Sequence, residues 1–389
     1  MLSDATLAMG EQVADALLGV DALYRQESGD EDGLVVLNMA QTPRQPTPFA
    51  SYDQASATWR ELGAAAAGLP EADRRLYYAQ LAESTLAFIA WRQTGLPFDE
   101  QLSRFLHVPA QPASKADLDS LRQGMRDLLT DLGYTGDLVA QCTAWEAKNR
   151  VPADEVPGVL NELLSEAWDR TEQLLEIPAP KSDGMQVIPV TGQAFNARCN
   201  YLERKVELNV DPILTRPGLK HLAVHEAYPG HYVQFKLRET WYRDGTAPAD
   251  NLLSVVNTAS SSPFEGIADA GMAMLNWAES PDDRVQMLMN RYRAGIGTVA
   301  AWQLHAEQKP LNEVTNWLRG QALSGGEGWA ANRMRFIAAP ARAVLIWSYW
   351  WGEAVVAPVW ARVDPARRGE FLRYLYGRMH SLDTVRMFA

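Results

Sequence analysis

The sequence has 389 residues, of which 47% are hydrophobic and 22% charged, a composition typical of globular rather than disordered chains. Its formal net charge is −12 and no basic stripe offsets it, so a surface that follows nucleic-acid phosphates is not expected. The length suffices for two packed lobes. We expect a helical N-terminal lobe over residues 1–180 and a metal-binding catalytic lobe over 181–389, joined in one integrated unit.

Helical patterns dominate the first half of the chain, where Ala, Leu, Glu and Arg recur at helical spacing. Turn-rich segments separate them, and such short connections favour antiparallel packing of neighbouring helices. The predicted helices cover residues 4–24, 53–67, 71–94, 115–132 and 153–175.

A change of pattern comes near residues 177–192, which are rich in Pro and Gly. Residues 197–210 then alternate partly between polar and apolar side chains, which predicts one or two short strands. A new helix is expected after Thr215, a suitable cap, with Pro217 in its first turn. The pattern stays helical to the end, so the predicted fold class is mainly α, with a small β element beside the predicted metal site.

The two cysteines, Cys142 and Cys199, are too few for a disulfide framework and indicate reduced thiols. The first residues lack a basic region followed by an apolar stretch, so no secretory signal is expected. Residues 338–360 are apolar but contain Arg342 and Glu353, which predicts a buried helix rather than a membrane span. We therefore expect a soluble, cytoplasmic protein with neither membrane nor nucleic acid as a partner.

Three histidines, His221, His225 and His231, lie within eleven residues, and Glu226 follows the second directly. Two neutral imidazoles can hold a zinc ion while a neighbouring glutamate activates a water molecule. The segment HEAYPGH therefore predicts the metal site of a zinc hydrolase.

The spacing of this segment is unusual, because four residues instead of two separate Glu226 from the second histidine. In a regular helix six residues turn the side chain by about 600°, which leaves His231 roughly 120° away from His225. Pro229 and Gly230 can interrupt the helix and return His231 to the site. Two alternatives stay open: a regular helix that pairs His221 with His225, and histidines that merely pack or form hydrogen bonds.

A third protein ligand is needed, and the segment SSPFEGIADAGM at residues 261–272 offers one. Glu265 and Asp269 are four residues apart and share one face of a helix starting near Pro263. Glu265 would bind the metal while Asp269 orients a ligating histidine. The alternative is a capping box, in which Glu265 bonds to the backbone of Ser262.

HLAVHEAYPGHYVQ resembles the HEGxPGHHxQ signature of the bacterial "domain of unknown function 885" proteins, which are considered zinc-peptidase-like. PFEGIADAGM is similar to that family's FxEGWAxY segment, and NVDPILTRPGLKHLAVHE to its approach to the motif. The resemblance covers roughly residues 201–388. It implies a helical fold like that of oligopeptidase-type gluzincins, with His225, His231 and Glu265 as metal ligands and Glu226 as general base.

The departures from that family lie outside these four residues. Its second consecutive histidine is Tyr232 here, and its amino-terminal half is usually longer. The family's DTGxH segment corresponds to residues 301–305, where the aspartate is missing and His305 remains. Its SYxxG segment corresponds to residues 348–352, which contain Tyr349. Either Tyr349 or His305 is a candidate donor to an oxyanion, the alternative being ordinary packing.

Four arginines, Arg291, Arg293, Arg333 and Arg335, lie among apolar neighbours in the sequence. They could bind a substrate carboxylate bidentately. Because acids outnumber bases in this chain, we favour salt bridges as their role.

The pattern as a whole predicts a zinc-dependent hydrolase of a peptide or small amide bond, with Glu226 moving the proton. The alternative enzyme keeps the metal but performs a lyase, rearrangement or iron-dependent oxidative step, since two histidines and a carboxylate also suit iron or another divalent metal. A binding module with a relic metal site is a third possibility, which an intact Glu226 disfavours. The substrate and the oligomeric state are not predicted.

Overall fold

Helices account for 66% of the computed structural model and strands for 6%, which confirms the mainly α prediction. The structure describes residues 2–29, 33–40, 44, 46–193 and 195–388. The chain divides into two compact units, one formed by residues 1–110, 234–266 and 354–389 and the other by 111–233 and 267–353. These units have other bounds than the predicted lobes, 1–180 and 181–389. The division into those two lobes stays a prediction.

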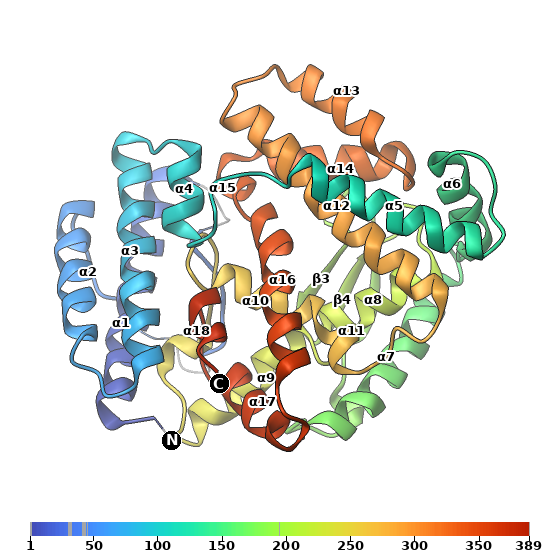
Figure 1. Cartoon of the computed structure of the whole chain (residues 1–389). Coiled ribbons are helices and arrows are strands. Elements are labelled where there is room, and N and C mark those ends of the chain that lie inside the picture. The colour runs from blue at the N-terminus through green and yellow to red at the C-terminus, as the bar shows by residue number, and fades with distance from the viewer. Residues whose placement is uncertain (1, 30–32, 41–43, 45, 194, 389) are drawn as a thin grey trace. The chain divides into compact units, whose positions relative to one another are not determined.

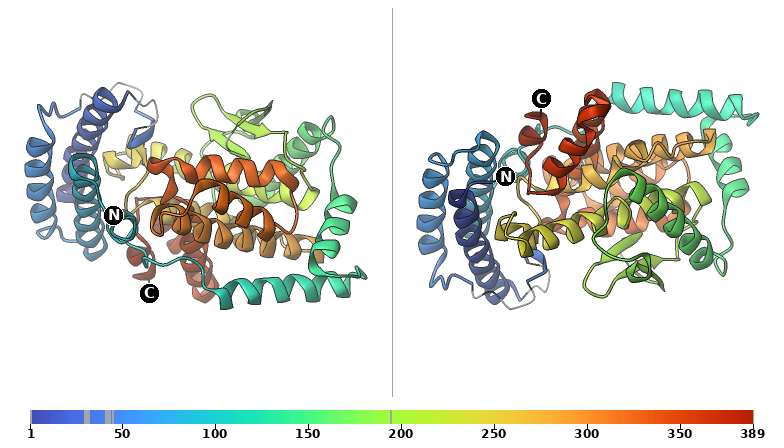
Figure 2. Two further views of the ribbon diagram at one scale, coloured as in Figure 1. Left: turned by 90° about the horizontal axis from the view of Figure 1, so that it is seen from above. Right: turned by 90° about the horizontal axis from the view of Figure 1, so that it is seen from below.

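The first unit is built on three long helices, α1 (Asp4–Ser28), α2 (Tyr52–Ala66) and α3 (Ala72–Thr94), which lie side by side in Figures 1 and 2. Strands β1 (Val35–Asn38) and β5 (Leu253–Val255) pair antiparallel in it. Its further elements are α4 (Phe98–Phe105), η2 (Ala249–Leu252), η3 (Pro365–Arg367), α17 (Arg368–Tyr376) and α18 (Leu382–Arg386).

The second unit combines helices with a three-stranded sheet. The sheet has the order β2-β4-β3, with β2 (Gln186–Val190) parallel and β3 (Ala197–Asn200) antiparallel to the central β4 (Lys205–Asn209). The two strands predicted within residues 197–210 are therefore present. The helical elements are α5 (Lys115–Asp131), α6 (Leu138–Asn149), α7 (Val156–Leu174), η1 (Lys181–Asp183), α8 (Arg216–Glu226), α11 (Gly271–Met274), α12 (Pro281–His305), α13 (Leu311–Gln321), α14 (Gly326–Ala338) and α15 (Pro340–Ala343).

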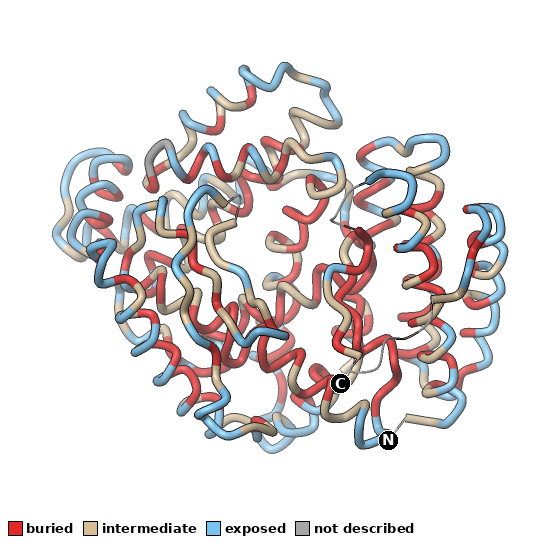
Figure 3. The backbone as a smooth tube through the Cα atoms, turned by 180° about the vertical axis from the view of Figure 1, so that it is seen from behind, coloured by how far each residue is buried: buried red, intermediate tan, exposed pale blue. Residues whose placement is uncertain are grey.

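Three helices contain residues of both units: α9 (His231–Arg243), α10 (Ser261–Asp269) and α16 (Ile346–Arg362). The five helices predicted in the first half are all present, within four residues of the predicted ends. Buried and exposed stretches alternate along the outer helices in Figure 3, as amphipathic helices require.

Two local features position the helices of the second unit. Thr215 caps α8 as predicted, its hydroxyl accepting a hydrogen bond from Gly218 N at 3.1 Å. In α12, a Cβ on Gly295 would lie 2.7 Å from a Leu118 methyl group of α5, so the small residue permits the close approach of α5 to α12. Figure 2 shows these two helices running alongside each other.

Candidate metal centre

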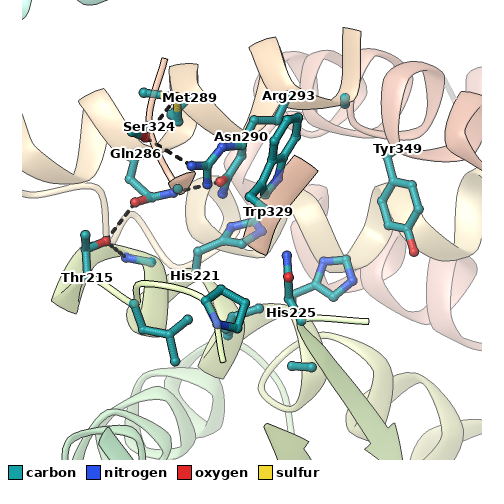
Figure 4. A pocket seen from close by; sticks show the side chains of 18 of the residues that line it. Thr215, His221, His225, Gln286, Met289, Asn290, Arg293, Ser324, Trp329 and Tyr349 are labelled. Carbon is teal, nitrogen blue, oxygen red and sulfur yellow. Dashed lines mark hydrogen bonds between the residues drawn. The ribbon is translucent and has the colours of Figure 1, made fainter. Parts of the chain in front are cut away.

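A pocket with a volume of about 240 Å³ lies within the second unit. Residues of α8, α12, α14 and α16 line it, together with the chain leading into β3. Figure 4 shows His221 and His225 on its lower side and Tyr349 at one end.

The HEAYPGH segment is a broken helix. Helix α8 ends at Glu226, Ala227 leaves the helical region with φ −125° and ψ −79°, and α9 begins at His231. The rings of His225 and His231 consequently face each other, with centroids 4.6 Å apart. The predicted interruption at Pro229-Gly230 is therefore confirmed, and it brings the second histidine back to the first.

Gly230 allows this break because its backbone lies directly on the end of α8. Its N–H donates to Val224 O at 3.0 Å. A Cβ at this position would lie 2.0 Å from His225 O and 2.4 Å from Val224 O, closer than real contacts permit. Only glycine fits here without a shift of the backbone that carries His225.

Asp269, the last residue of α10, holds the ring of His225. One of its carboxylate oxygens lies 2.8 Å from His225 Nδ1. Because a carboxylate only accepts, Nδ1 carries the proton and the ring's lone pair is on Nε2. Burial alone would raise the pKa of Asp269, but the charges and hydrogen bonds of His225 and His221 lower it well below its usual range. The predicted orienting role of Asp269 agrees with this geometry.

The side chains of His221, His225 and Asp269 also lie close enough together to be considered as a group of metal ligands. Two ligand atoms on one tetrahedral zinc ion are about 3.3 Å apart, given bonds of about 2.0 Å. The 2.8 Å between Asp269 and His225 Nδ1 is instead a hydrogen-bond distance, while His221 Nε2 lies 3.5 Å from the same carboxylate oxygen. This geometry favours Asp269 as a partner of the histidines over Asp269 as a ligand.

Glu226 lines the pocket and is 6% exposed. Cys199 of β3 is close enough to Glu226 to be affected by its charge. Burial, with a contribution from that charge, raises the pKa of the Cys199 thiol well above its usual value. Strand β3 is an edge strand, since β4 is its only partner in the described sheet, and Ala197 lines the pocket. The small β element thus stands beside the site, as expected.

Tyr349 of α16 also lines the pocket, its ring stacked on His225 at 6.3 Å and 25°. Arg291 of α12 fixes the neighbouring backbone, donating to Tyr349 O at 3.3 Å and to Trp350 O. The same guanidinium lies 3.7 Å from the ring centroid of Trp350. Tyr349 is therefore held at the pocket by the packing of α12 against α16.

His305 is placed elsewhere. Its Nε2 lies 2.7 Å from Ile337 O, and its ring does not contribute to the lining of the pocket. The structure does not bring this residue to the other candidates.

Glu265 lies on α10, four residues before Asp269, as the spacing predicted. Helix α10 begins at Ser261, two residues before Pro263. Glu265 belongs to the first unit and the two histidines to the second. Its role as a ligand stays a prediction.

Glu353 of α16 is a pocket residue that the sequence analysis did not assign to the site. Burial, and after it the charge of Asp269, raises the pKa of this carboxyl group to about 7, against the opposing charge of Arg291. A glutamate inside the most apolar segment of the chain was the available signal, because such residues are seldom buried without a role.

Neither a family model nor a curated protein sequence matches the chain. Solved structures with a similar fold include two candidate lipoproteins. One is a candidate lipoprotein of unknown function from Shewanella oneidensis, with a TM-score of 0.53 and 12% identity over 86% of this chain and 70% of that one. The other is a candidate lipoprotein from Colwellia psychrerythraea, with a TM-score of 0.54 and 14% identity over 86% of this chain and 62% of that one. At such low identity, the likeness concerns the fold alone.

The prediction of a cytoplasmic location is wrong by this comparison. Both structural neighbours are described as candidate lipoproteins, and lipoproteins are anchored to membranes. Two reduced thiols and the first residues of the chain were its only support, and neither reports on a compartment directly. Among the described residues, no helix has both the length and the apolar character required to cross a bilayer.

Proposed function

We propose that the protein is a metal-dependent hydrolase of a peptide or small amide bond, with a zinc site arranged as in gluzincins. The observation that carries the proposal is the broken helix, which sets the rings of His225 and His231 4.6 Å apart beside Glu226. The resemblance of the segment HLAVHEAYPGHYVQ to the "domain of unknown function 885" signature supports the same conclusion. A purely structural zinc would have no need of the buried carboxylate of Glu226.

The donor set suits zinc. His225 presents Nε2 because Asp269 holds Nδ1, and His231 faces it. Glu265 is the proposed third ligand, because it precedes Asp269 by one turn of α10 and projects from the same face. Three protein ligands leave one position open, as in catalytic rather than structural zinc sites.

A zinc ion held there would polarise the scissile carbonyl and lower the pKa of a water molecule. Glu226 would accept the proton of that water and deliver it to the leaving nitrogen. Tyr349 would donate a hydrogen bond to the oxygen that gains negative charge. The edge of β3 would hold an extended substrate by its backbone groups.

The first test is metal content together with turnover. The full chain, purified without added metal, is expected to carry zinc in stoichiometric amount and to hydrolyse a member of a broad panel of amides and peptides. Glu226→Gln should keep the metal and lose about 10²- to 10⁴-fold in turnover, the range of general acid–base catalysis. Glu172→Gln, at an exposed position of α7, is the matched control and should retain wild-type turnover.

Equal turnover by wild type and Glu226→Gln would overturn the mechanism. Stoichiometric iron with little zinc would overturn the hydrolase assignment in favour of an oxidative reaction.

A further inference from the structure

The pocket contains two arginines that the proposed mechanism does not use, Arg293 of α12 and Arg333 of α14. Their guanidinium carbons lie 5.2 Å and 5.9 Å from the ring centroid of the same residue, Trp329. Arg293 also donates to Ser324 Oγ at 3.0 Å and is braced against Gly325. The stem of Arg333 packs against Gly297. Both cations are thus fixed in place by neighbouring helices.

Neither arginine has an acidic partner among the described residues. No carboxylate oxygen there lies within 4.0 Å of either guanidinium, although 48 acids face 36 bases in the chain. The Nε atom of Arg333 is buried and has no hydrogen-bond partner in that part of the chain. Salt bridges, the role favoured from the sequence, are therefore not what these residues form.

The two positive charges also act on each other. Burial lowers the pKa of Arg293 to about 10, against the opposing charge of Glu146, and the positive charge of Arg333 contributes to this lowering. Burial likewise lowers the pKa of Arg333, against the influence of Tyr349. Paired cations in a desolvated site are unfavourable unless an anion joins them.

We propose that Arg293 and Arg333 form a binding site for a carboxylate of the substrate, which makes the substrate a small amide or peptide that carries a free carboxylate. This inference rests on the proposed function, because the bound carboxylate belongs to a substrate only if the protein is a hydrolase. In Figure 4, Arg293, Asn290 and Ser324 gather on one side of Trp329, while His225 and Tyr349 lie on the other. The anionic end and the reacting bond of one molecule would thus lie on opposite sides of this indole.

Three features fit a small carboxylate as the bound anion. A volume of about 240 Å³ is below the roughly 300 Å³ at which pockets for drug-sized ligands begin. Glu146 and Asp269 line the same pocket, and their charges would repel a dianionic phosphate more than a monoanionic carboxylate. Arginine's planar fork matches the two oxygens of a carboxylate.

The test measures binding with two pairs of probes that differ only in charge: hippurate against N-benzoylglycinamide, and N-acetylglycine against N-acetylglycinamide. Calorimetric titrations use the full chain with Glu226→Gln, loaded with zinc, so that no probe is turned over. At least one carboxylate should bind tighter than its amide by roughly tenfold to a hundredfold. Arg333→Met and Arg293→Met should each remove most of that preference.

Arg335→Met is the matched control, because Arg335 is exposed on the same helix and lies outside the pocket. It should leave the preference unchanged. If Arg333→Met does not fold, Arg333→Lys carries the same comparison, since lysine keeps the charge but loses the bidentate fork.

If the protein with both arginines intact binds the carboxylates and the amides equally, the inference is wrong. Tighter binding of inorganic phosphate than of either carboxylate would also overturn it. Repeating the titrations on metal-free protein separates this inference from the proposed function. A carboxylate preference that persists without metal supports the arginine site even if no amide is hydrolysed. Hydrolysis with no carboxylate preference refutes the arginine site alone.

Discussion

At the scale of single residues, the contact between Asp269 and His225 is the most informative. It selects the tautomer of His225 and thereby the nitrogen that can bind a metal. It also explains why His221, four residues before His225, need not be a ligand: its Nε2 shares the same carboxylate at a longer 3.5 Å.

Asp269→Asn should weaken zinc binding about tenfold to a hundredfold, because an amide holds the ring less firmly and adds no charge. Competition with a chromophoric chelator measures this loss. His221→Ala should leave zinc affinity near the wild-type value. Complete loss of zinc in both variants would instead identify His221, His225 and Asp269 as the ligand group.

At the scale of elements, the junction of α8 and α9 decides the site. Gly271, at the start of α11, supports the junction from the other side, because a Cβ there would lie 2.4 Å from Val224 Cγ1 and 3.1 Å from Pro229 Cδ. Two glycines thus enclose the turn between the two histidines.

Gly230→Ala should lower the free energy of unfolding by about 1–3 kcal/mol, the usual effect of overpacking, and weaken zinc binding as His225 shifts. Urea unfolding and the chelator competition test both effects. Gly158→Ala in α7 is the control: its Cβ would meet nothing within 4 Å, and alanine should stabilise that helix by roughly 0.5–1 kcal/mol. Wild-type stability in Gly230→Ala would show that the turn is looser than the interatomic distances indicate.

At the scale of the whole molecule, segments far apart in the sequence meet in the core of the first unit. The carboxylate of Asp250 accepts a hydrogen bond from Tyr78 OH at 3.0 Å. Asn251, its neighbour, donates to Gly377 O at 2.9 Å. Burial raises the pKa of Asp250 from 3.8 to about 6, against the charges of Arg74 and Arg238.

The stability of the fold should therefore depend on pH through Asp250. Between about pH 4 and pH 6 the folded state keeps a proton that the unfolded state releases, so stability falls as pH rises through this window, by up to ~3 kcal/mol. Urea unfolding of wild type and Asp250→Asn from pH 4 to 7 measures it. The variant should gain stability relative to wild type as pH rises; parallel curves would contradict the raised pKa.

Local chemistry determined much of what could be predicted from the sequence. Helix periodicity and caps such as Thr215 act within a few residues, so the helices of the first half and the start of α8 were predictable. The break at Pro229-Gly230 follows from dihedral limits of those two residues. The four-residue spacing of Asp269 from Glu265 predicted that Asp269 orients a ligating histidine, and only the structure shows that this histidine is His225.

Only tertiary structure decided the rest, because it depends on packing between distant segments. Strand β1 is too short to be recognised without β5, more than 200 residues away, and β2 contains Pro189 yet pairs with β4. His305 follows a plausible motif, but the packing of α12 and α14 turns it to a backbone carbonyl. The sequence favoured salt bridges for Arg293 and Arg333, but folding places both guanidinium groups near Trp329, with no carboxylate of the described residues within 4.0 Å. The spacing of residues in the sequence shows which side chains share one helix or strand. Whether a charged side chain is buried, and which partner it contacts, depends on which helices and strands pack together.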